Sequence, residues 1–441
     1  MRIALLTYST KPRGSVVHTL ELAEALHQLG HTVCVYALDK DGRGFDRSLN
    51  FEVKLVPALP VTGDTDALIQ QRIQEFVSFL SQDLQRCDYD SDYDSEYDIF
   101  HAQDCISANA LAVLRQQNLI SHFVRTVHHI EDYISPYLQQ CQDRSIREPD
   151  LCLCVSDYWQ KQLYQQYHIN APRVINGVNC DRFTNTPSDR DSRLKEAMGI
   201  SGSPVYLTVG GIEPRKNTIQ LAKAFAKVQS VYPQAQLVIA GGATLFDYQS
   251  YRDEFFVEID RLNLKVGTSL LLPGIIADAD LPSLYRCADA FVFPSVKEGW
   301  GLVVLEAIAS GLPTIVSYHP PFTEFLTTQQ TLFVEPDDPD SIASALKVGT
   351  SLLLPGIIAD ADLPSLYRCA DAFVFPSVKE GWGLVVLERS QTALQIASDR
   401  VKAKYGMACS LALGQLQRIE TQAQQYQQSD QPEVKVIRFI E

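Results

Sequence analysis

The sequence lacks any long apolar run. No uninterrupted apolar stretch of the 441-residue chain approaches the ~18 residues that a membrane-spanning helix requires. The opening residues, MRIALLTYST, are typical of a strand and lack the basic region and apolar block of a signal peptide. We therefore expect a cytoplasmic protein without a transmembrane segment, while a peripheral membrane contact stays open.

Positive charge is also scarce. The chain carries 38 Lys and Arg against 53 Asp and Glu, which gives a formal net charge of −15. An excess of negative charge disfavours nucleic acid and anionic membrane surfaces as main partners, because both are themselves negative. A few basic side chains can still hold a phosphate within an acidic protein. The charge balance therefore excludes nucleic-acid binding as the main function and leaves small phosphorylated ligands open.

Several sequence motifs of catalysis and metal binding are missing. The ten cysteines show neither C-x2-C pairs nor the Cys–His spacing of zinc sites, so we expect reduced thiols. The chain has no Walker loop, no G-x-S-x-G and no H-E-x-x-H. The run CDYDSDYDSEYD (Cys87–Asp98) contains D-x-D matches, but its alternation of acids with Ser and Tyr is typical of a solvated loop. We therefore expect neither a metal nor a cofactor.

What is present is an alternation of strands and helices in two halves. The length favours two domains, and a hydrophobic content of 46% supplies their cores. Short apolar runs separated by segments of helical spacing predict parallel sheets with helices on both faces. We predict an α/β protein of two doubly wound, Rossmann-like domains that face a cleft, followed by helices. The predicted ranges are 1–181, 182–345, a duplicated segment 346–388 and a helical tail 389–441.

The duplication is an unusual feature of the sequence. Residues Leu264–Glu306 and Leu346–Glu388 are identical over 43 positions. After the first copy the chain continues AIASGLPTIVSY, a helix and then a strand, as a βαβ crossover requires. The second copy is followed by further helix, so we interpret Lys347–Leu387 as an insertion that splits one helix and is non-catalytic. Recombination during gene assembly is a second origin that the sequence leaves open.

The first copy contains a turn suited to a phosphorylated sugar. Ala290–Pro294 is a predicted strand, and the turn EGWG after it precedes a helix from Leu302, so the turn lies where open α/β sheets bind ligands. The glycines allow close approach of the backbone, and free amides at the helix start favour an anion. Carboxylates repel phosphate, so we expect Glu298 and Glu306 to bind hydroxyls. A glycine turn with solvated glutamates is the alternative reading.

Cations and a histidine pair lie at other strand ends. The second half opens with VGGIEPRKN, in which Arg215 and Lys216 precede a helix and are suited to clamp a diphosphate. The first half offers Gly14 and Ser15 in its first turn, and His128 at the end of VRTVHH. A solvated basic pair and a structural histidine are the competing interpretations of these segments taken singly.

Together these segments resemble the GT-B glycosyltransferases of glycosyltransferase family 4 over most of residues 1–345. The most specific match is a Glu-x7-Glu element, Glu298–Glu306, followed by A-x-A-x-G-x-P in Ala307–Pro313. The other stretches that carry the resemblance are KPRGSVVHTLELAEALHQLGHTV, TVHH, VINGVN, EPRKN and DADLPSLYRCADAFVFPS. The opening stretch and TVHH are similar to a bacterial subgroup whose substrates stay open.

The resemblance implies a metal-independent, retaining transfer of a hexose from a nucleotide-diphosphate sugar to an acceptor on the N-terminal domain. It implies that Glu298 contacts the hexose, Glu306 contacts the ribose, and Arg215 and Lys216 hold the diphosphate. His128 is implied to lean over the donor sugar. The other implied donor-binding positions are Gly14, Ser15, Gly210, Gly211, Ile275, Ile276, Gly299, Trp300, Gly301 and Leu302.

The chain departs from the family pattern in one phosphate contact. The family usually has Arg where this chain has Gly211, which leaves Arg215 and Lys216 to compensate. Two other functions are compatible with the same scaffold: a sugar phosphorylase or epimerase, and a donor-binding pseudoenzyme inactivated by the insertion. The donor base, the hexose, the acceptor and the oligomeric state stay open.

Overall fold

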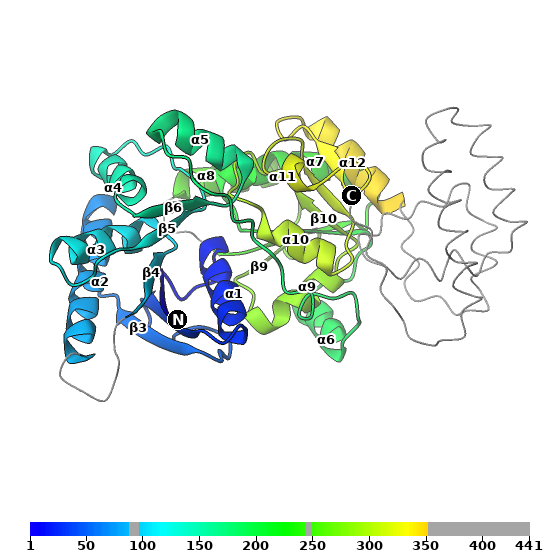
Figure 1. The fold of residues 1–441 in the computed structure, drawn as a ribbon. Helices are drawn as coiled ribbons and strands as arrows, with labels where there is room; N and C mark the ends of the chain where they lie inside the picture. Colours follow the sequence, from blue (N-terminus) through cyan, green and yellow to red (C-terminus); the bar gives the residue numbers. More distant parts are fainter. Residues whose placement is uncertain (88–96, 243–247, 352–441) are drawn as a thin grey trace, which may run out of the picture. The chain divides into compact units, whose positions relative to one another are not determined.

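The computed structural model describes residues 1–87, 97–242 and 248–351 (Figure 1). The first half contains a six-stranded parallel sheet in the order β3-β2-β1-β4-β5-β6. Its strands are β1 (Arg2–Thr7), β2 (Thr32–Asp39), β3 (Glu52–Pro57), β4 (Ile99–Ala102), β5 (Val124–Val127) and β6 (Leu151–Cys154). Its helices are α1 (Gly14–Gln28), α2 (Thr65–Cys87), α3 (Cys105–Gln116), α4 (Pro136–Arg147) and α5 (Asp157–Tyr167).

The second half repeats this plan with the sheet order β12-β11-β10-β7-β8-β9, again all parallel. Its strands are β7 (Val205–Val209), β8 (Gln236–Ala240), β9 (Leu270–Gly274), β10 (Ala290–Phe293), β11 (Thr314–Ser317) and β12 (Leu332–Val334). Its helices are α6 (Asp189–Met198), α7 (Thr218–Gln229), α8 (Gln249–Arg261), α9 (Leu281–Arg286), α10 (Leu302–Ala309), α11 (Phe322–Phe325) and α12 (Pro339–Ser351). The predicted α/β fold with two doubly wound halves is thereby confirmed.

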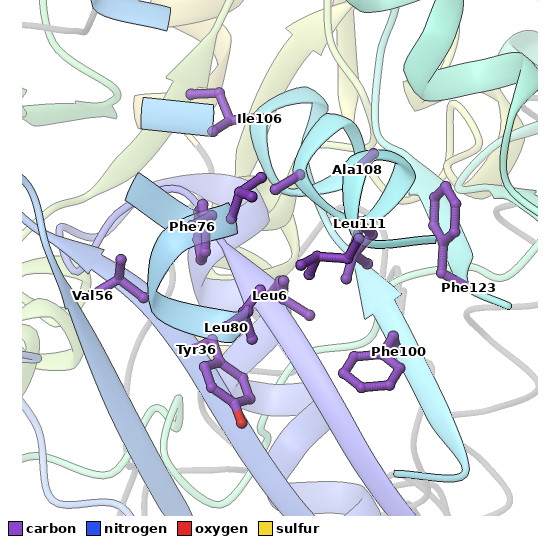
Figure 2. Packing of buried hydrophobic residues seen from close by; sticks show 14 of the residues in the cluster. Leu6, Tyr36, Val56, Phe76, Leu80, Phe100, Ile106, Ala108, Leu111 and Phe123 are labelled. Atoms are coloured by element: carbon purple, nitrogen blue, oxygen red, sulfur yellow. The ribbon is translucent and has the colours of Figure 1, made fainter. Parts of the chain in front are cut away.

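The central strands are largely apolar because helices cover both faces of each sheet. In β1, Ala4 and Leu6 face one hydrophobic cluster whereas Ile3 and Leu5 face another, as the two-residue period of a strand requires. Figure 2 shows the first cluster, in which Leu6 of the sheet lies among side chains of α2 and α3. Burial of this kind stabilises each half by roughly 25 cal/mol for every Å² of apolar surface removed from water.

Each sheet reverses its strand order once, and these reversals place the site. The order changes between β1 and β4 in the first sheet and between β7 and β10 in the second. Ligands of open α/β sheets bind outside the carboxyl ends of the strands at such reversals. The loops after these four strands are therefore where chemistry is expected.

The sequence-based prediction placed no strand at β3, β9 or β12, and it gave no bounds for several helices, α2 among them. The domain boundaries proposed from sequence stay predictions. The helical tail 389–441 and nearly all of the second copy lie outside the described residues. Within the described ranges, no helix is both long and apolar enough to cross a membrane.

Candidate active site

The site is built around the carboxylate of Glu298, in the loop between β10 and α10. Arg215 Nη1 donates to Glu298 Oε1 at 3.0 Å, and Lys216 Nζ donates to the same oxygen at 2.6 Å. Ser295 Oγ lies 2.8 Å from it as well. All three contacts converge on Oε1, and the described residues make no hydrogen bond to Oε2. One oxygen therefore anchors the side chain, and the other can accept from a ligand.

Electrostatics keep this carboxylate charged although it is buried. Burial alone raises the pKa of Glu298, but Lys216 and Arg215 outweigh burial and lower the pKa to about 2. Burial and the neighbouring Arg215 lower the pKa of Lys216 to about 8, while Glu298 opposes this shift. The ammonium of Lys216 also sits 4.3 Å above the centre of the Phe293 ring. At neutral pH the cluster is therefore one anion held between two cations.

Arg215 is held in place from a second side by Glu213, which the sequence analysis did not single out. Glu213 is only 2% exposed, and its Oε2 lies 3.1 Å from Arg215 Nε. A weaker ion pair joins Glu213 Oε1 to Arg13 Nη1 at 3.7 Å. The carboxylates of Glu213 and Glu298 raise the pKa of Arg215, so its guanidinium stays charged.

Glu306 lies in α10 and has a separate environment. It is 5% exposed and accepts a hydrogen bond of 2.7 Å from the hydroxyl of Tyr285. Burial raises the pKa of Glu306 to about 7, although the Tyr285 hydrogen bond and Arg182 oppose this shift. The structure therefore distinguishes the two glutamates of the Glu-x7-Glu element: one is firmly ionised, and the other titrates near neutrality.

His128 follows β5 and reaches the loop of Glu298 through its backbone. A Cβ placed on Gly299 would collide with the His128 carbonyl oxygen, so only glycine fits this approach. The imidazole is buried, and its Nε2 lies 3.1 Å from Gln103 Oε1. Burial, aided by His18 and Arg125, lowers the pKa of His128 well below its usual value, so the ring is neutral.

Of the other residues predicted to bind the donor, some are placed to contact a ligand through the backbone and others through the side chain. Gly301 ends the loop at φ 96°, immediately before Leu302 opens α10. The Trp300 ring is 5% exposed and packs 4.7 Å from that of Phe325, which leaves the backbone of Trp300 for any ligand contact. Ile275 is 62% exposed, and its side chain lies over Gly242, whereas Ile276 is partly buried in the core.

The first helix and the turn after β7 hold the other glycines. Gly14 opens α1, where a Cβ would meet no atom within 4 Å, and Ser15 follows it. Gly210 and Gly211 take φ 140° and 77°. A Cβ on Gly211 would lie 2.7 Å from the Gly242 carbonyl oxygen. The backbone conformation and the close contact both favour glycine at this position.

Sequence reasoning missed Glu213, Ser295 and Tyr285 as partners of the predicted charges. Each lies in a stretch already noticed, but only tertiary packing shows which charged group it contacts. No group of three His, Cys, Asp or Glu side chains suited to a metal ion occurs within residues 1–87, 97–242 and 248–351. Most of the acidic run Cys87–Asp98 lies outside these ranges.

Family comparisons match both halves of the chain. Residues 191–348 match the family described as "Glycosyl transferases group 1", and residues 12–182 match "Glycosyltransferase Family 4". Residues 385–439 match the family of the nitrogen starvation-induced protein NitG. The first two matches together span most of the chain and include every predicted site residue.

Individual relatives point the same way. O-antigen chain mannosyltransferase B of Escherichia coli is 28% identical over 51% of this chain and 58% of its own length. An uncharacterized glycosyltransferase of Methanocaldococcus jannaschii, MJ1607, is 25% identical over 78% of this chain and 87% of its own. The alpha-monoglucosyldiacylglycerol synthase of Streptococcus pneumoniae is 27% identical over 73% of this chain and 72% of its own.

Solved structures show the same fold. Anabaena HepE in complex with UDP and glucose superposes with a TM-score of 0.62 at 19% identity, over 79% of this chain and 89% of HepE. Sucrose-phosphate synthase of Thermosynechococcus elongatus also gives 0.62, at 22% identity, over 96% of this chain and 99% of its own. With its two doubly wound sheets and both family matches, the chain belongs to the group 1 glycosyltransferases of family 4, enzymes of the GT-B fold.

Proposed function

We propose that this glycosyltransferase moves a hexose from a nucleoside-diphosphate sugar to an acceptor hydroxyl with retention of configuration. The observation that carries the proposal is the convergence of Arg215, Lys216 and Ser295 on one oxygen of Glu298. This arrangement aligns two cations for a diphosphate and leaves the second carboxylate oxygen for sugar hydroxyls. The names of the relatives, mannosyltransferases among them, support a hexose.

Charge separation in the transition state explains the need for these residues. As the bond between the anomeric carbon and the phosphate oxygen breaks, negative charge grows on the diphosphate. Arg215 and Lys216 stabilise that charge together with the amides at the start of α10. Two protein cations thereby supply the charge that a metal ion supplies in other transferases, and we propose that no metal takes part. Removal of one such prearranged donor typically costs about 3–4 kcal/mol of barrier.

The retaining step then needs no second carboxylate as nucleophile. The acceptor oxygen bonds to the anomeric carbon on the face that the diphosphate leaves, and the acceptor proton passes to the departing phosphate oxygen. Glu298 orients the hexose through Oε2, and Glu306 binds the ribose hydroxyls. The neutral His128 imidazole neighbours the sugar without repelling its cationic anomeric carbon.

The duplication favours one alternative, a donor-binding protein that no longer turns over. We would test both readings by incubating the full chain, and the chain lacking Lys347–Leu387, with UDP-, GDP- and ADP-sugars. Release of nucleoside diphosphate by both forms supports the transferase. Release by the shortened chain alone supports the inactive alternative, and no release by either form contradicts the proposed function. Conversion of the free donor to another sugar nucleotide would identify an epimerase, and turnover that requires inorganic phosphate would identify a phosphorylase.

A further inference from the structure

The loop that carries Glu298 is joined to the first half of the chain through its backbone. The indole Nε1 of Trp159, in α5, donates to the Glu298 carbonyl oxygen at 3.0 Å. The next residue, Gly299, lies against the carbonyl group of His128. The carboxylate of Glu298 is held instead by the three side chains of the second half that converge on its Oε1. Glu298 is therefore anchored by its backbone to one half and by its side chain to the other.

The indole of Trp159 is confined to one orientation. Its residue is 2% exposed and belongs to an apolar cluster that draws on both halves, with Leu163 of α5 and Trp300 of the Glu298 loop among its members. Ser156 caps the start of α5, because its hydroxyl accepts from the Trp159 amide at 3.2 Å. Close packing leaves a buried ring little freedom, so its N–H points to one place.

The start of α5 is also tied to the second half. Glu324, in α11, accepts from the amide of Asp157 at 2.7 Å and from the amide of Tyr158 at 2.8 Å. Such amides have no partner within the helix itself, and a carboxylate complements the positive end of the helix dipole. Both α11 and the Glu298 loop belong to the second half, so α5 is held in a fixed position beside that loop.

A second indole in the apolar cluster offers a comparison. Trp300 is 5% exposed, and its Nε1 is buried without a hydrogen-bond partner among the described residues. Packing of an indole in this cluster therefore does not require that its N–H be bonded. The hydrogen bond from Trp159 to Glu298 is thus a contribution separate from packing.

We propose that Trp159 is a positioning residue for the transfer reaction. Its N–H holds the Glu298 loop so that the second carboxylate oxygen and the amides at the start of α10 keep their places against the donor. Because the contact is made to the backbone, it acts on the position of Glu298 and leaves its charge unchanged. The inference rests on the proposed function, which places the donor sugar at Glu298 and the diphosphate at these amides. A misplacement of about 1 Å in such a group can cost about 100-fold in rate.

Two substitutions separate the hydrogen bond from the packing. Trp159→Phe keeps an aromatic ring but has no N–H. Trp159→His loses more apolar volume, yet its Nε2 follows Cγ by two bonds, as Nε1 of tryptophan does, so a donor is available at the same place. We expect kcat/KM to fall about tenfold to 100-fold in Trp159→Phe and no more than about threefold in Trp159→His. The substrate is whichever of the UDP-, GDP- and ADP-sugars the original chain turns over. The melting temperature should fall further in Trp159→His, because its cavity is larger.

Hydrogen exchange gives a readout that needs no turnover. The amides of the Glu298 loop should exchange about tenfold faster in Trp159→Phe than in the original chain, since one restraint on the loop is lost. In Trp159→His their rate should stay close to the original. Mass spectrometry would measure the exchange on peptides that run past Glu306, because the two copies of the duplicated segment have the same sequence up to that residue.

Leu163→Ala is the matched control, because Leu163 lies one turn further along α5, is fully buried in the same cluster and carries no hydrogen-bond donor in its side chain. It should lower the melting temperature but leave kcat/KM and the exchange of the loop within about twofold. If Trp159→Phe does not fold, benzothienylalanine in place of Trp159 removes the N–H at nearly constant volume.

The two explanations predict opposite orders of the variants. Activity and loop exchange that follow the melting temperatures, or that are equal in Trp159→Phe and Trp159→His, would overturn the inference. If the original chain turns over no donor while the exchange rates keep the expected order, the result counts against the proposed function alone.

Discussion

At the scale of single residues, the candidate site is a set of paired charges: Glu298 is held by Arg215 and Lys216, and Arg215 is also held by Glu213. Motif and position identified Glu298, Arg215 and Lys216, because a strand end beside a helix start is a physical setting that a sequence reveals. Arg215 lies between the carboxylates of Glu298 and Glu213. Tertiary packing brings Glu213 to Arg215, and the sequence does not show this contact. The distinct environments of Glu298 and Glu306 likewise follow from burial, which residue spacing does not specify.

Lys216 should give donor binding an alkaline limit. Burial and Arg215 lower the pKa of Lys216 to about 8, so the cation is present below that pH and is lost above it. If this charge holds the diphosphate, affinity for the nucleoside diphosphate should fall about tenfold for each pH unit above 8. Calorimetric titration of the chain with the nucleoside diphosphate, at pH values from 7 to 10, measures this affinity. Lys216→Arg should shift the decline to higher pH, and a flat profile in the original chain would refute the assignment.

The raised pKa of Glu306 should make the free energy of unfolding fall as the pH rises. An ion-paired acid, whose pKa is lowered, has the opposite effect. Its pKa in the folded protein is about 7, above the ordinary 4.5, so the folded state holds this proton more tightly than the unfolded chain. The resulting stabilisation is fully present below pH 4.5 and is lost as the pH rises through 7, by about 3 kcal/mol. Glu306→Gln removes this dependence.

The measurement compares melting temperatures of the original chain and Glu306→Gln between pH 4.5 and 7.5. The original chain should lose several degrees relative to the variant across this window. Parallel curves for the two proteins would mean that Glu306 titrates normally in the folded state.

At the scale of elements, context decides structure where local sequence does not. The hexapeptide LKVGTS occurs twice. In the first copy (264–269) it forms an isolated bridge and a turn before β9, whereas in the second (346–351) it completes α12. Leu346 is fully buried in the core beside α7, as a continuation of the preceding helix requires. The helix therefore continues into the first six residues of the second copy.

The elements that the sequence analysis missed have weak or mixed signals. β3 is an edge strand with Glu52 and Lys54 among its residues, and β12 spans only three residues. β9 ends in Pro273 and Gly274, which read as a turn. The helix α2 is different, since its apolar residues recur at helical spacing and a systematic scan would have found it.

Position 299, in the loop between β10 and α10, should not tolerate a side chain, because the loop lies there against the backbone of His128, which follows β5. Gly299→Ala places a Cβ against the His128 carbonyl, so the loop must shift. We expect a loss of stability of about 1–3 kcal/mol, typical of overpacking, with reduced donor turnover. Gly177→Ala is the matched control, because a Cβ there meets no atom within 4 Å. Thermal melts and donor kinetics of both variants provide the comparison, and equal behaviour would show that the contact is dispensable.

At the scale of the whole molecule, the first copy of the duplicated segment is part of the second sheet. The first copy supplies β9 and β10, and β10 pairs with both β7 and β11 inside the second sheet. Its flanks continue that sheet directly, so the Glu298 of this copy meets Arg215 and Lys216. The EPRKN segment that supplies these two cations occurs once in the sequence.

The most direct measurement compares one substitution made in each of the two copies of the duplicated segment. Glu298→Gln and Glu380→Gln are the same substitution in the same local sequence, made separately in the full chain. Glu298→Gln should lower kcat/KM for the sugar nucleotide by about 100-fold or more, because it removes the charge that aligns Arg215 and Lys216. Glu380→Gln should remain within about twofold of the original chain. Equal losses in both variants, or a loss confined to Glu380→Gln, would contradict the assignment of the active site to the first copy.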